Sequence, residues 1–410
     1  MTTSYVPPDS PKPTFLGKLV IFAFIVACGY GAYRLYFKDR IKRFSSSSPS
    51  PSTSSSPAAS SGGASFGSSA PEAEIGIAYG TEKKSWLEWA AKEFATTDAG
   101  KKIRINLFPM GSLEGAQALV GGDQRINVWS PASSLYKDSF VQDWQVKYSK
   151  APIAKEESLA LTPMVFVMWD ERYQAFVKKY GAVSFDTIEK ALGEPTGWQA
   201  VANKPEWGLF KFGQTNPSVS NSGLATLVLM AYEHQKKTKG LAIADVVDPQ
   251  FQQQLSTIEK AVSLSDSTGT MMREMVLKGP SAYDCIFAYE SVAIDYLKSA
   301  AGRWGELHVV YPRLNMWNDN PYYVIDASWT SPDQRKAAEV FLEFLMSDRV
   351  QRQSLEHGFR PGNPSVPVMF PESPFTVYQR FGLRNEIGTV CEYPKGDVLN
   401  NLLASWQRSR

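Results

Sequence analysis

Apolar residues change repeatedly between strand and helix spacing once the chain passes residue 73. The run from Glu74 to Tyr79 predicts a short strand, and Gly80-Thr81 predicts a turn after it. From Glu82 to Phe94 the apolar residues recur at helical spacing, and Ile103 to Phe108 and Asn127 to Trp129 predict two further strands. Repeated strand–turn–helix units predict a parallel sheet with helices on both faces, and such sheets bind ligands beyond the carboxyl ends of their strands.

The second half of the chain has the same pattern with longer apolar runs. Leu159 to Trp169 suits a fully buried strand that passes from one lobe to another. Lys211 to Thr215 predicts a strand, which the polar stretch from Asn216 to Gly223 separates from a helix over Leu224 to Tyr232. Tyr283 to Tyr289 is apolar enough for another buried strand. The alternation therefore continues well beyond one small sheet.

An uncharged apolar run from Leu19 to Tyr33 precedes this region. Counted from Phe15 to Phe37, it reaches the about 20 residues that a membrane-spanning helix needs. It therefore predicts a transmembrane or signal-anchor helix over residues 15–37, after a short tail of residues 1–14. A cleaved signal peptide is one alternative. The other is a lipoprotein signal, in which Ile25-Val26-Ala27-Cys28 makes Cys28 a lipid-modified amino terminus.

The residues that follow this segment combine a charge cluster with a low-complexity tract. The basic residues lie mostly after the segment, and this bias favours a cytoplasmic position for the rest of the chain. The fold expected downstream favours export instead, and we follow it. Ser45 to Ala70 is nearly all Ser, Pro, Gly and Ala, so residues 38–72 predict a flexible linker.

The size, charge and residue content of the chain limit the classes of function to expect. The 410 residues exceed the size at which a single core usually keeps growing, so two lobes are expected. A net charge of +2 gives no reason to expect nucleic acid as a partner. Outside the apolar segment, Cys285 and Cys391 either form one disulfide or are separately buried thiols. The three histidines are isolated, no motif supplies a nucleophile with its base, and so neither an enzyme nor a cofactor is expected.

Four segments together resemble the type II periplasmic (extracellular) solute-binding protein family, in its sulfate/molybdate-like branch of ABC transporter substrate-binding proteins. The first two resemble the turn after the family's first strand and its second ligand-facing loop. The others resemble the loop entering the main helix of the second lobe and the carboxyl-terminal helix with its following turn. These segments are residues 79–86, 128–134, 213–223 and 341–361. The likeness covers the chain from about Ala73 to Arg410.

The resemblance implies an α/β, two-lobed periplasmic-binding-protein-like fold (type II), with two strands crossing between the lobes. The crossings are expected at Leu161 to Met168 and at Ile286 to Ser291. Lobe 1 is then expected to begin with residues 73–164 and lobe 2 to span residues 165–288. Residues 289–410 are expected to return to lobe 1 and add carboxyl-terminal helices.

Small hydroxyl residues stand where three of the predicted strands give way to helices. They are Thr81, the pair Ser130 and Ser133, and the pair Ser220 and Ser222. Helix starts carry unpaired N–H groups and a partial positive charge, so several of them facing one cleft hold an oxyanion. Glu82 and Asn221, next to these hydroxyls, complete the candidate set. The alternative is ordinary capping, in which each hydroxyl serves its own helix.

Tyr289 and Glu290, at the expected second crossing, are the other candidate ligand contacts. Tyr289 has a hydroxyl to donate across the cleft. Glu290 repels an oxyanion unless an Arg or Lys pairs with it. Its alternative role is an ion pair at the hinge, and a cleft-facing Glu290 would favour a ligand with a cation, an amine or hydroxyls.

The resemblance implies a membrane-tethered receptor on the extracytoplasmic side that captures a small solute, an oxyanion being favoured, for an ABC-type permease. Lobes of this kind close around a ligand. A ligand-sensing or assembly module with the same fold, signalling to a membrane partner, is the alternative. The anchor and the long linker suit both functions.

Overall fold

The structure, a computed structural model, describes residues 71–300 and 302–410. The predicted tail, the predicted anchor with Cys28, and nearly all of the predicted linker lie outside these residues. No helix within the two described stretches is long and apolar enough to cross a membrane.

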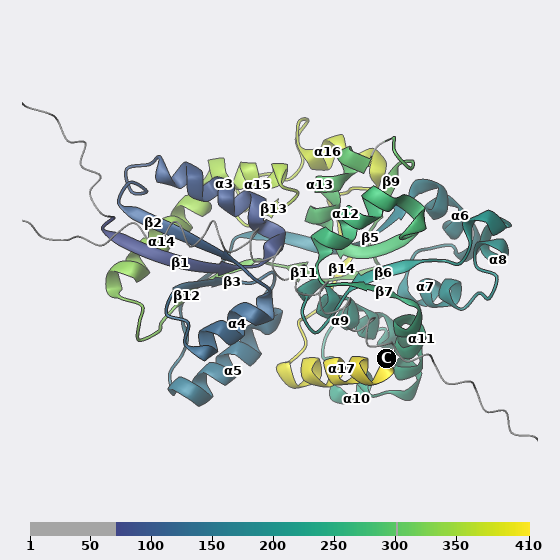
Figure 1. Ribbon diagram of the computed structural model, residues 1–410, viewed down its shortest axis with the longest axis horizontal. Helices are drawn as coiled ribbons and strands as arrows, with labels where there is room; N and C mark the ends of the chain where they lie inside the picture. The colour runs from purple at the N-terminus through teal and green to yellow at the C-terminus, as the bar shows by residue number, and fades with distance from the viewer. Residues whose placement is uncertain (1–70, 301) are drawn as a thin grey trace, which may run out of the picture. The chain divides into compact units, whose positions relative to one another are not determined.

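Two sheets, each with its own helices, organise the described residues (Figure 1). The first sheet has five strands in the order β2-β1-β3-β12-β4, and we call it with its helices lobe 1. Its strands are β1 (Ala73–Tyr79), β2 (Ile103–Pro109), β3 (Val128–Ser130), β4 (Ile153–Ser158) and β12 (Pro321–Ile325). Its helices are α3 (Lys84–Ala95), α4 (Ser112–Gly121), α5 (Lys137–Tyr148), α14 (Pro332–Leu345) and α15 (Asp348–Glu356).

Strand β1 shows why lobe 1 forms. Ile75 and Ile77 pack with α3 and α14, while Ala78 belongs to the core on the opposite side. Alternate residues of a strand face opposite sides, so both faces of β1 become buried between helix layers. In Figure 1, α3 and α15 lie on one side of this sheet and α4 and α5 on the other. The strand and helix predicted over residues 74–94 are confirmed.

The second sheet has seven strands, with a main path β11-β5-β8-β6-β7 and with β9 and β13 pairing β5; we call it with its helices lobe 2. Its strands are β5 (Ala160–Trp169), β6 (Phe212–Thr215), β7 (Ser263–Ser265), β8 (Cys285–Tyr289), β9 (Leu307–Val310), β11 (Trp317–Asn318) and β13 (Arg360–Pro361). Its longer helices are α6 (Asp170–Tyr180), α7 (Phe185–Leu192), α9 (Asn221–Gln235), α11 (Pro249–Ala261), α12 (Thr268–Lys278), α13 (Glu290–Ala300) and α17 (Gly396–Ser409).

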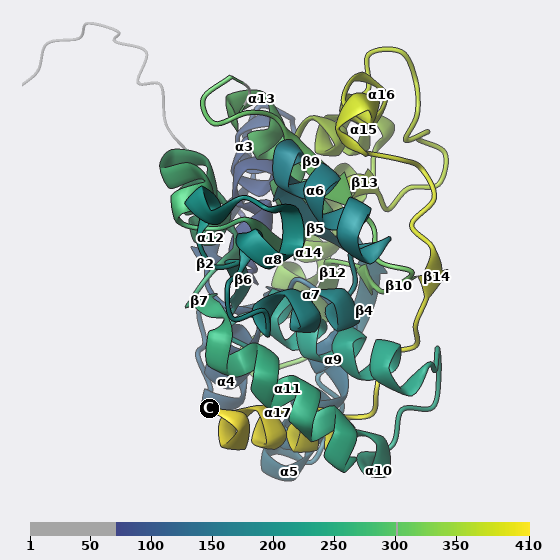
Figure 2. The ribbon, with the colours of Figure 1, turned by 90° about the vertical axis from the view of Figure 1, so that its right-hand side faces the viewer.

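Shorter elements complete the lobes. The remaining helices are α8 (Trp198–Ala202), α10 (Ile243–Val246) and α16 (Pro374–Val377), and β10 (Leu314–Asn315) pairs β14 (Thr389–Val390). The 3-10 turns are η1 (Thr81–Lys83), η2 (Ser134–Tyr136), η3 (Pro205–Trp207), η4 (Gly279–Ser281) and η5 (Gln379–Phe381). Helix α17 packs on α10 and α11, as Figure 2 shows.

The chain passes between the lobes three times, once from α15 into β13 and twice along antiparallel routes. One leads from β4 into β5, and the other leads from β11 into β12, with Asn318 opposite Thr162 and Pro321 opposite Ser158. The second crossing expected at Ile286 to Ser291 was wrong. Those residues form β8, between β5 and β6 inside lobe 2, and the start of α13. Their apolar character comes from burial within that sheet rather than from a crossing.

Candidate functional site

The carboxyl ends of β1 and β3 lie side by side in lobe 1. Tyr79 is opposite Ser130 in the parallel register, and the Gly80 amide donates to the Ser130 carbonyl at 3.0 Å. Residues 80–83 and 131–136 therefore leave the sheet together at one edge. In lobe 2, β6 ends at Thr215 and its following loop leads into α9.

Asn221, the first residue of α9, connects side chains of both lobes. The Ser133 hydroxyl of lobe 1 donates to its Oδ1 at 3.0 Å. Its Nδ2 donates to the Tyr289 hydroxyl and to Asn318 Oδ1, both at 2.9 Å. All four residues are buried. This network, formed by Ser133, Asn221, Tyr289 and Asn318, joins lobe 1, the start of α9, the end of β8 and the β11–β12 crossing.

The first turn of α9 has donors to spare. The amides of Asn221, Ser222 and Gly223 have no hydrogen-bond partner among the described residues, and the N-cap Ser220 makes no capping bond. A Cβ on Gly223 would lie 2.7 Å from Pro217 N and closer still to the Thr215 carbonyl, so only glycine lets the helix begin this near β6. A helix of this length with unpaired N–H groups has a partial positive charge at its start.

The Ser222 hydroxyl lies inside a small cluster of hydroxyls. It is 2.6 Å from both Thr215 Oγ1 and Thr268 Oγ1, and 3.1 Å from Ser220 Oγ. Hydroxyls in such a chain orient one another. The capping alternative does not describe Ser220 and Ser222, whose oxygens bond to side chains instead of helix amides.

A buried ion pair lies at the corresponding edge of lobe 1. Lys83 is fully buried, and its Nζ contacts Glu82 Oε1 at 2.6 Å and donates to the Pro131 carbonyl at 3.1 Å. Burial lowers the pKa of Lys83, and the charge of Glu82 opposes this shift. Nothing in the sequence predicted Lys83 for this site, because two adjacent lysines after Glu82 resemble the solvated face of a helix.

Two further buried hydroxyls at this edge lack partners. Ser130 Oγ and Tyr79 OH have no hydrogen-bond partner among the described residues. Burial raises the pKa of Tyr79 to about 12, so its hydroxyl stays protonated and is a donor. Unpaired buried hydroxyls cost free energy, which makes them candidates for contact with a ligand.

Glu290 and Thr81 lie apart from this network. Both oxygens of Glu290 bond to the Arg360 guanidinium, at 2.7 and 2.8 Å, and the Tyr311 hydroxyl donates to the same carboxylate. Tyr289 and Glu290 thus use opposite sides of the chain. Glu290 forms the ion pair considered for it, but both partners belong to lobe 2 and not to the crossing expected at Ile286 to Ser291. Thr81 is exposed at the start of η1.

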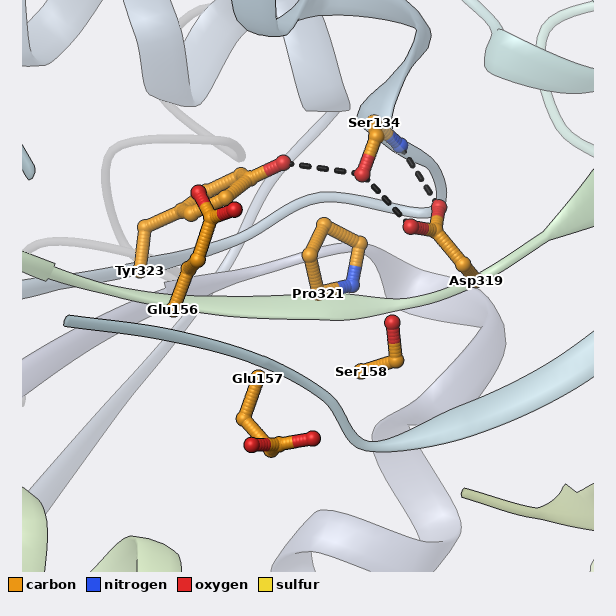
Figure 3. A pocket seen from close by; sticks show the side chains of 7 residues that line it. All are labelled: Ser134, Glu156, Glu157, Ser158, Asp319, Pro321 and Tyr323. Carbon is orange, nitrogen blue, oxygen red and sulfur yellow. Dashed lines mark hydrogen bonds between the residues drawn. The ribbon is translucent and has the colours of Figure 1, made fainter.

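An acidic hollow of about 230 Å³ lies beside the β11–β12 crossing (Figure 3). In Figure 3 Ser134 points toward Asp319 and Tyr323, while Glu157 lies away from them. The Ser134 amide and hydroxyl donate to Asp319 at 2.7 and 2.5 Å, and Tyr393 OH donates to Asp319 at 3.1 Å. These groups satisfy one another, and the carboxylates disfavour an anion there.

Metal and disulfide chemistry find no support in residues 71–300 and 302–410. No cluster of three His, Cys, Asp or Glu residues there is placed to hold a metal ion. Cys285 and Cys391 are separately buried thiols. Burial raises the pKa of the Cys391 thiol to about 11.

Solved structures share this fold at low sequence identity. The sulfate-binding protein SubI from Mycobacterium tuberculosis H37Rv is 15% identical, with 78% of this chain and 93% of that chain covered and a TM-score of 0.50. A periplasmic thiamin binding protein is 12% identical, with 82% of this chain and 96% of that chain covered and a TM-score of 0.55. Iron-bound HitA from Pseudomonas aeruginosa is 13% identical, with 82% of this chain and 99% of that chain covered and a TM-score of 0.53. At these identities the likeness shows the two-lobed fold alone.

Comparison with curated proteins gives no match. A model of the family described as bacterial extracellular solute-binding protein matches residues 75–360, which is most of both lobes. The family resemblance read from the sequence is therefore confirmed, and the chain belongs to the bacterial extracellular solute-binding protein family.

Proposed function

We propose that the protein is a solute receptor that holds a small oxyanion between its lobes and delivers it to an ABC-type permease. The start of α9 carries this proposal. The backbone amides of Asn221, Ser222 and Gly223 have no partner among the described residues, so they are free to donate to a ligand. They lie where the two lobes meet, because the Asn221 side chain bonds to Ser133 of lobe 1. Such a helix start suits an anion because N–H groups and the helix dipole act together.

Charge in the surroundings is compatible with this ligand. The Glu290 carboxylate, which would repel an anion, is neutralised by Arg360. At the facing edge of lobe 1 the carboxylate of Glu82 is likewise paired, with the buried Lys83, so it does not stand as an unpaired negative charge. The neighbours named for sulfate, thiamin and iron bind different solutes on one fold, so the choice of an oxyanion comes from these residues and not from the likeness.

The same residues favour binding over catalysis. A receptor needs donors of fixed geometry, and the cluster of hydroxyls and amides supplies them without a nucleophile–base pair. We further propose that residues 15–37 tether the receptor to the membrane with both lobes outside the cytoplasm. Protease accessibility of the Ser-rich linker in intact cells tests this topology, and protection of the linker from external protease would contradict it.

Calorimetric titration of the full chain with sulfate, molybdate and phosphate tests the ligand class. Ser130→Ala should weaken binding of the recognised oxyanion about 5- to 150-fold, since a lost buried hydrogen bond costs about 1–3 kcal/mol. The same change should leave the unliganded protein as stable as before, because Ser130 Oγ has no partner there among the described residues. Ser299→Ala, an exposed helical serine, is the matched control.

Two results would count against the proposal. One is no binding of any of the three oxyanions to the unaltered chain. The other is unchanged affinity in Ser130→Ala together with unchanged affinity in Ser222→Ala, which would remove both the lobe 1 and the lobe 2 hydroxyls from the site.

A further inference from the structure

A groove of about 630 Å³ lies in lobe 2, away from the network around Asn221. Its walls come from α6, the start of α7, the end of α9, the end of β9 with the residues after it, and the residues after η5. The volume lies within the range of small-molecule sites, roughly 300–1,000 Å³. None of its lining residues belongs to the candidate solute site described above.

Charged groups of both signs line this groove. Asp186 and Glu233 form an acidic side, where the Asp186 amide donates to Glu233 Oε1 at 3.1 Å. Arg313 and Arg384 supply guanidinium groups from the residues before β10 and after η5. In the described part of the chain, none of these four side chains has an opposite charge within 4.0 Å. Asp186 Oδ1 accepts a hydrogen bond from Gln254 Nε2 at 2.9 Å, which leaves its other oxygen for a ligand. Charged groups that share a groove without an ion pair remain available to a ligand.

The floor between the charges is apolar and aromatic. Tyr173, Val177, Val310 and Tyr311 line it. The Arg384 guanidinium lies 4.8 Å from the centre of the Tyr311 ring, a cation–π contact that fixes its direction. Backbone atoms of Arg384 are also held, since its carbonyl accepts from Arg360 Nη2 at 2.7 Å. The basic side of the groove is therefore preorganised.

We propose that this groove is a second ligand site, for a free amino acid with an apolar side chain. The guanidinium groups bind its carboxylate, the carboxylates of Asp186 and Glu233 bind its ammonium group, and its side chain packs on the Tyr173 and Tyr311 rings. A ligand with a single charge satisfies only one side of the groove. The requirement for both charges distinguishes this site from the oxyanion site between the lobes.

Glu233 is partly buried on the acidic side, and burial disfavours its charged form. Burial raises the pKa of Glu233 to about 7, and an ammonium group placed against it would favour its ionised form. The nearby Arg313 already acts in that direction without making an ion pair.

Titration calorimetry with the full chain tests the proposal, using L-phenylalanine as the probe. Phenylacetate and phenethylamine are its two singly charged counterparts, and each should bind at least tenfold more weakly. Arg384→Gln and Glu233→Gln should each weaken phenylalanine binding at least tenfold. Both variants retain the backbone contacts at these positions, and a denaturation curve checks that they fold.

Asn221→Ala separates this site from the proposed solute site. It should leave phenylalanine binding unchanged, since Asn221 does not line the groove. Loss of phenylalanine binding in Asn221→Ala, with binding retained in Arg384→Gln, would overturn the groove proposal while leaving a solute site between the lobes. No phenylalanine binding, or equal binding of a singly charged counterpart, would also overturn it. Failure of the oxyanions to bind would not affect the groove.

Discussion

Removing the guanidinium of Arg360 tests how β13 is held in lobe 2. Arg360 and Glu290 have side chains that are 5% and 0% exposed, and two hydrogen bonds of 2.7 and 2.8 Å join them. Arg360 also donates to the carbonyls of Arg384 and Asn385. Arg360→Leu leaves the Glu290 carboxylate buried with only the Tyr311 hydroxyl as a partner. We expect the free energy of unfolding to fall by about 3–5 kcal/mol.

This loss is large beside the roughly 5–15 kcal/mol that stabilises a typical folded domain. Most of this loss should come from burying the Glu290 carboxylate without a cation, and less from losing its attraction to Arg360. The double variant Glu290→Leu with Arg360→Leu removes that charge, so it should be at least about 2 kcal/mol more stable than Arg360→Leu alone. The two exposed residues that lose a donor, Arg384 and Asn385, can bond to water instead.

Urea denaturation followed by tryptophan fluorescence gives the free energies by linear extrapolation. Lys101→Leu is the control, because its ion pair with Asp98 is 65% and 100% exposed and should contribute less than about 1 kcal/mol. A cost below about 1 kcal/mol for Arg360→Leu would refute the reasoning. So would a double variant as unstable as the sum of its two single changes, since the two side chains would then act independently.

Three shorter predictions follow from the site and the groove. Asn221→Ala should weaken solute binding at least fivefold by titration calorimetry, because it removes the side chain that joins the lobes; unchanged affinity would contradict this. Gly223→Ala should lower the free energy of unfolding by about 1–3 kcal/mol, because the new Cβ would clash with the backbone nitrogen of Pro217. A fall of less than about 0.5 kcal/mol in urea denaturation would contradict this prediction. Because burial raises the pKa of Glu233 to about 7 from an ordinary 4.5, the folded state holds its proton longer, so stability should fall as pH rises between about 4.5 and 7. Glu233→Gln should flatten that fall in urea titrations at several pH values, and an unaltered slope would argue against it.

Local patterns were sufficient to predict individual strands and helices, while the two-lobed arrangement came from the family resemblance. The strand over Glu74 to Tyr79 and the helix after it follow from apolar spacing within a few residues, and both occur as predicted. The loop after Thr215 was recognised from its Ser and Asn residues, but the helix begins at Asn221, three residues before the predicted start at Leu224. The β11–β12 crossing was missed because its two-residue strand Trp317–Asn318 is too short to give a period.

Contacts between residues far apart in the sequence could not be predicted from such patterns. Asn318 reaches Asn221 across 97 positions of sequence, and nothing local to either residue indicates the other. Lys83 is buried because Glu82 and the Pro131 carbonyl satisfy it, which only the folded edge of lobe 1 brings about. Charged side chains are usually exposed, so a sequence pattern assigns such a lysine to the surface.

For Glu290, chemical reasoning from the sequence predicts that a partner exists but does not identify it. A carboxylate after the buried strand β8 must find a cation or hydrogen-bond donors, because an unpaired buried charge is too costly to keep. That argument predicts a partner without naming it. The structure provides Arg360, 70 positions later, through β13, whose pairing with β5 brings the two side chains together. Because Tyr289 and Glu290 are adjacent, one faces the Asn221 network and the other faces Arg360. A single strand end therefore serves both the candidate site and the ion pair that holds β13.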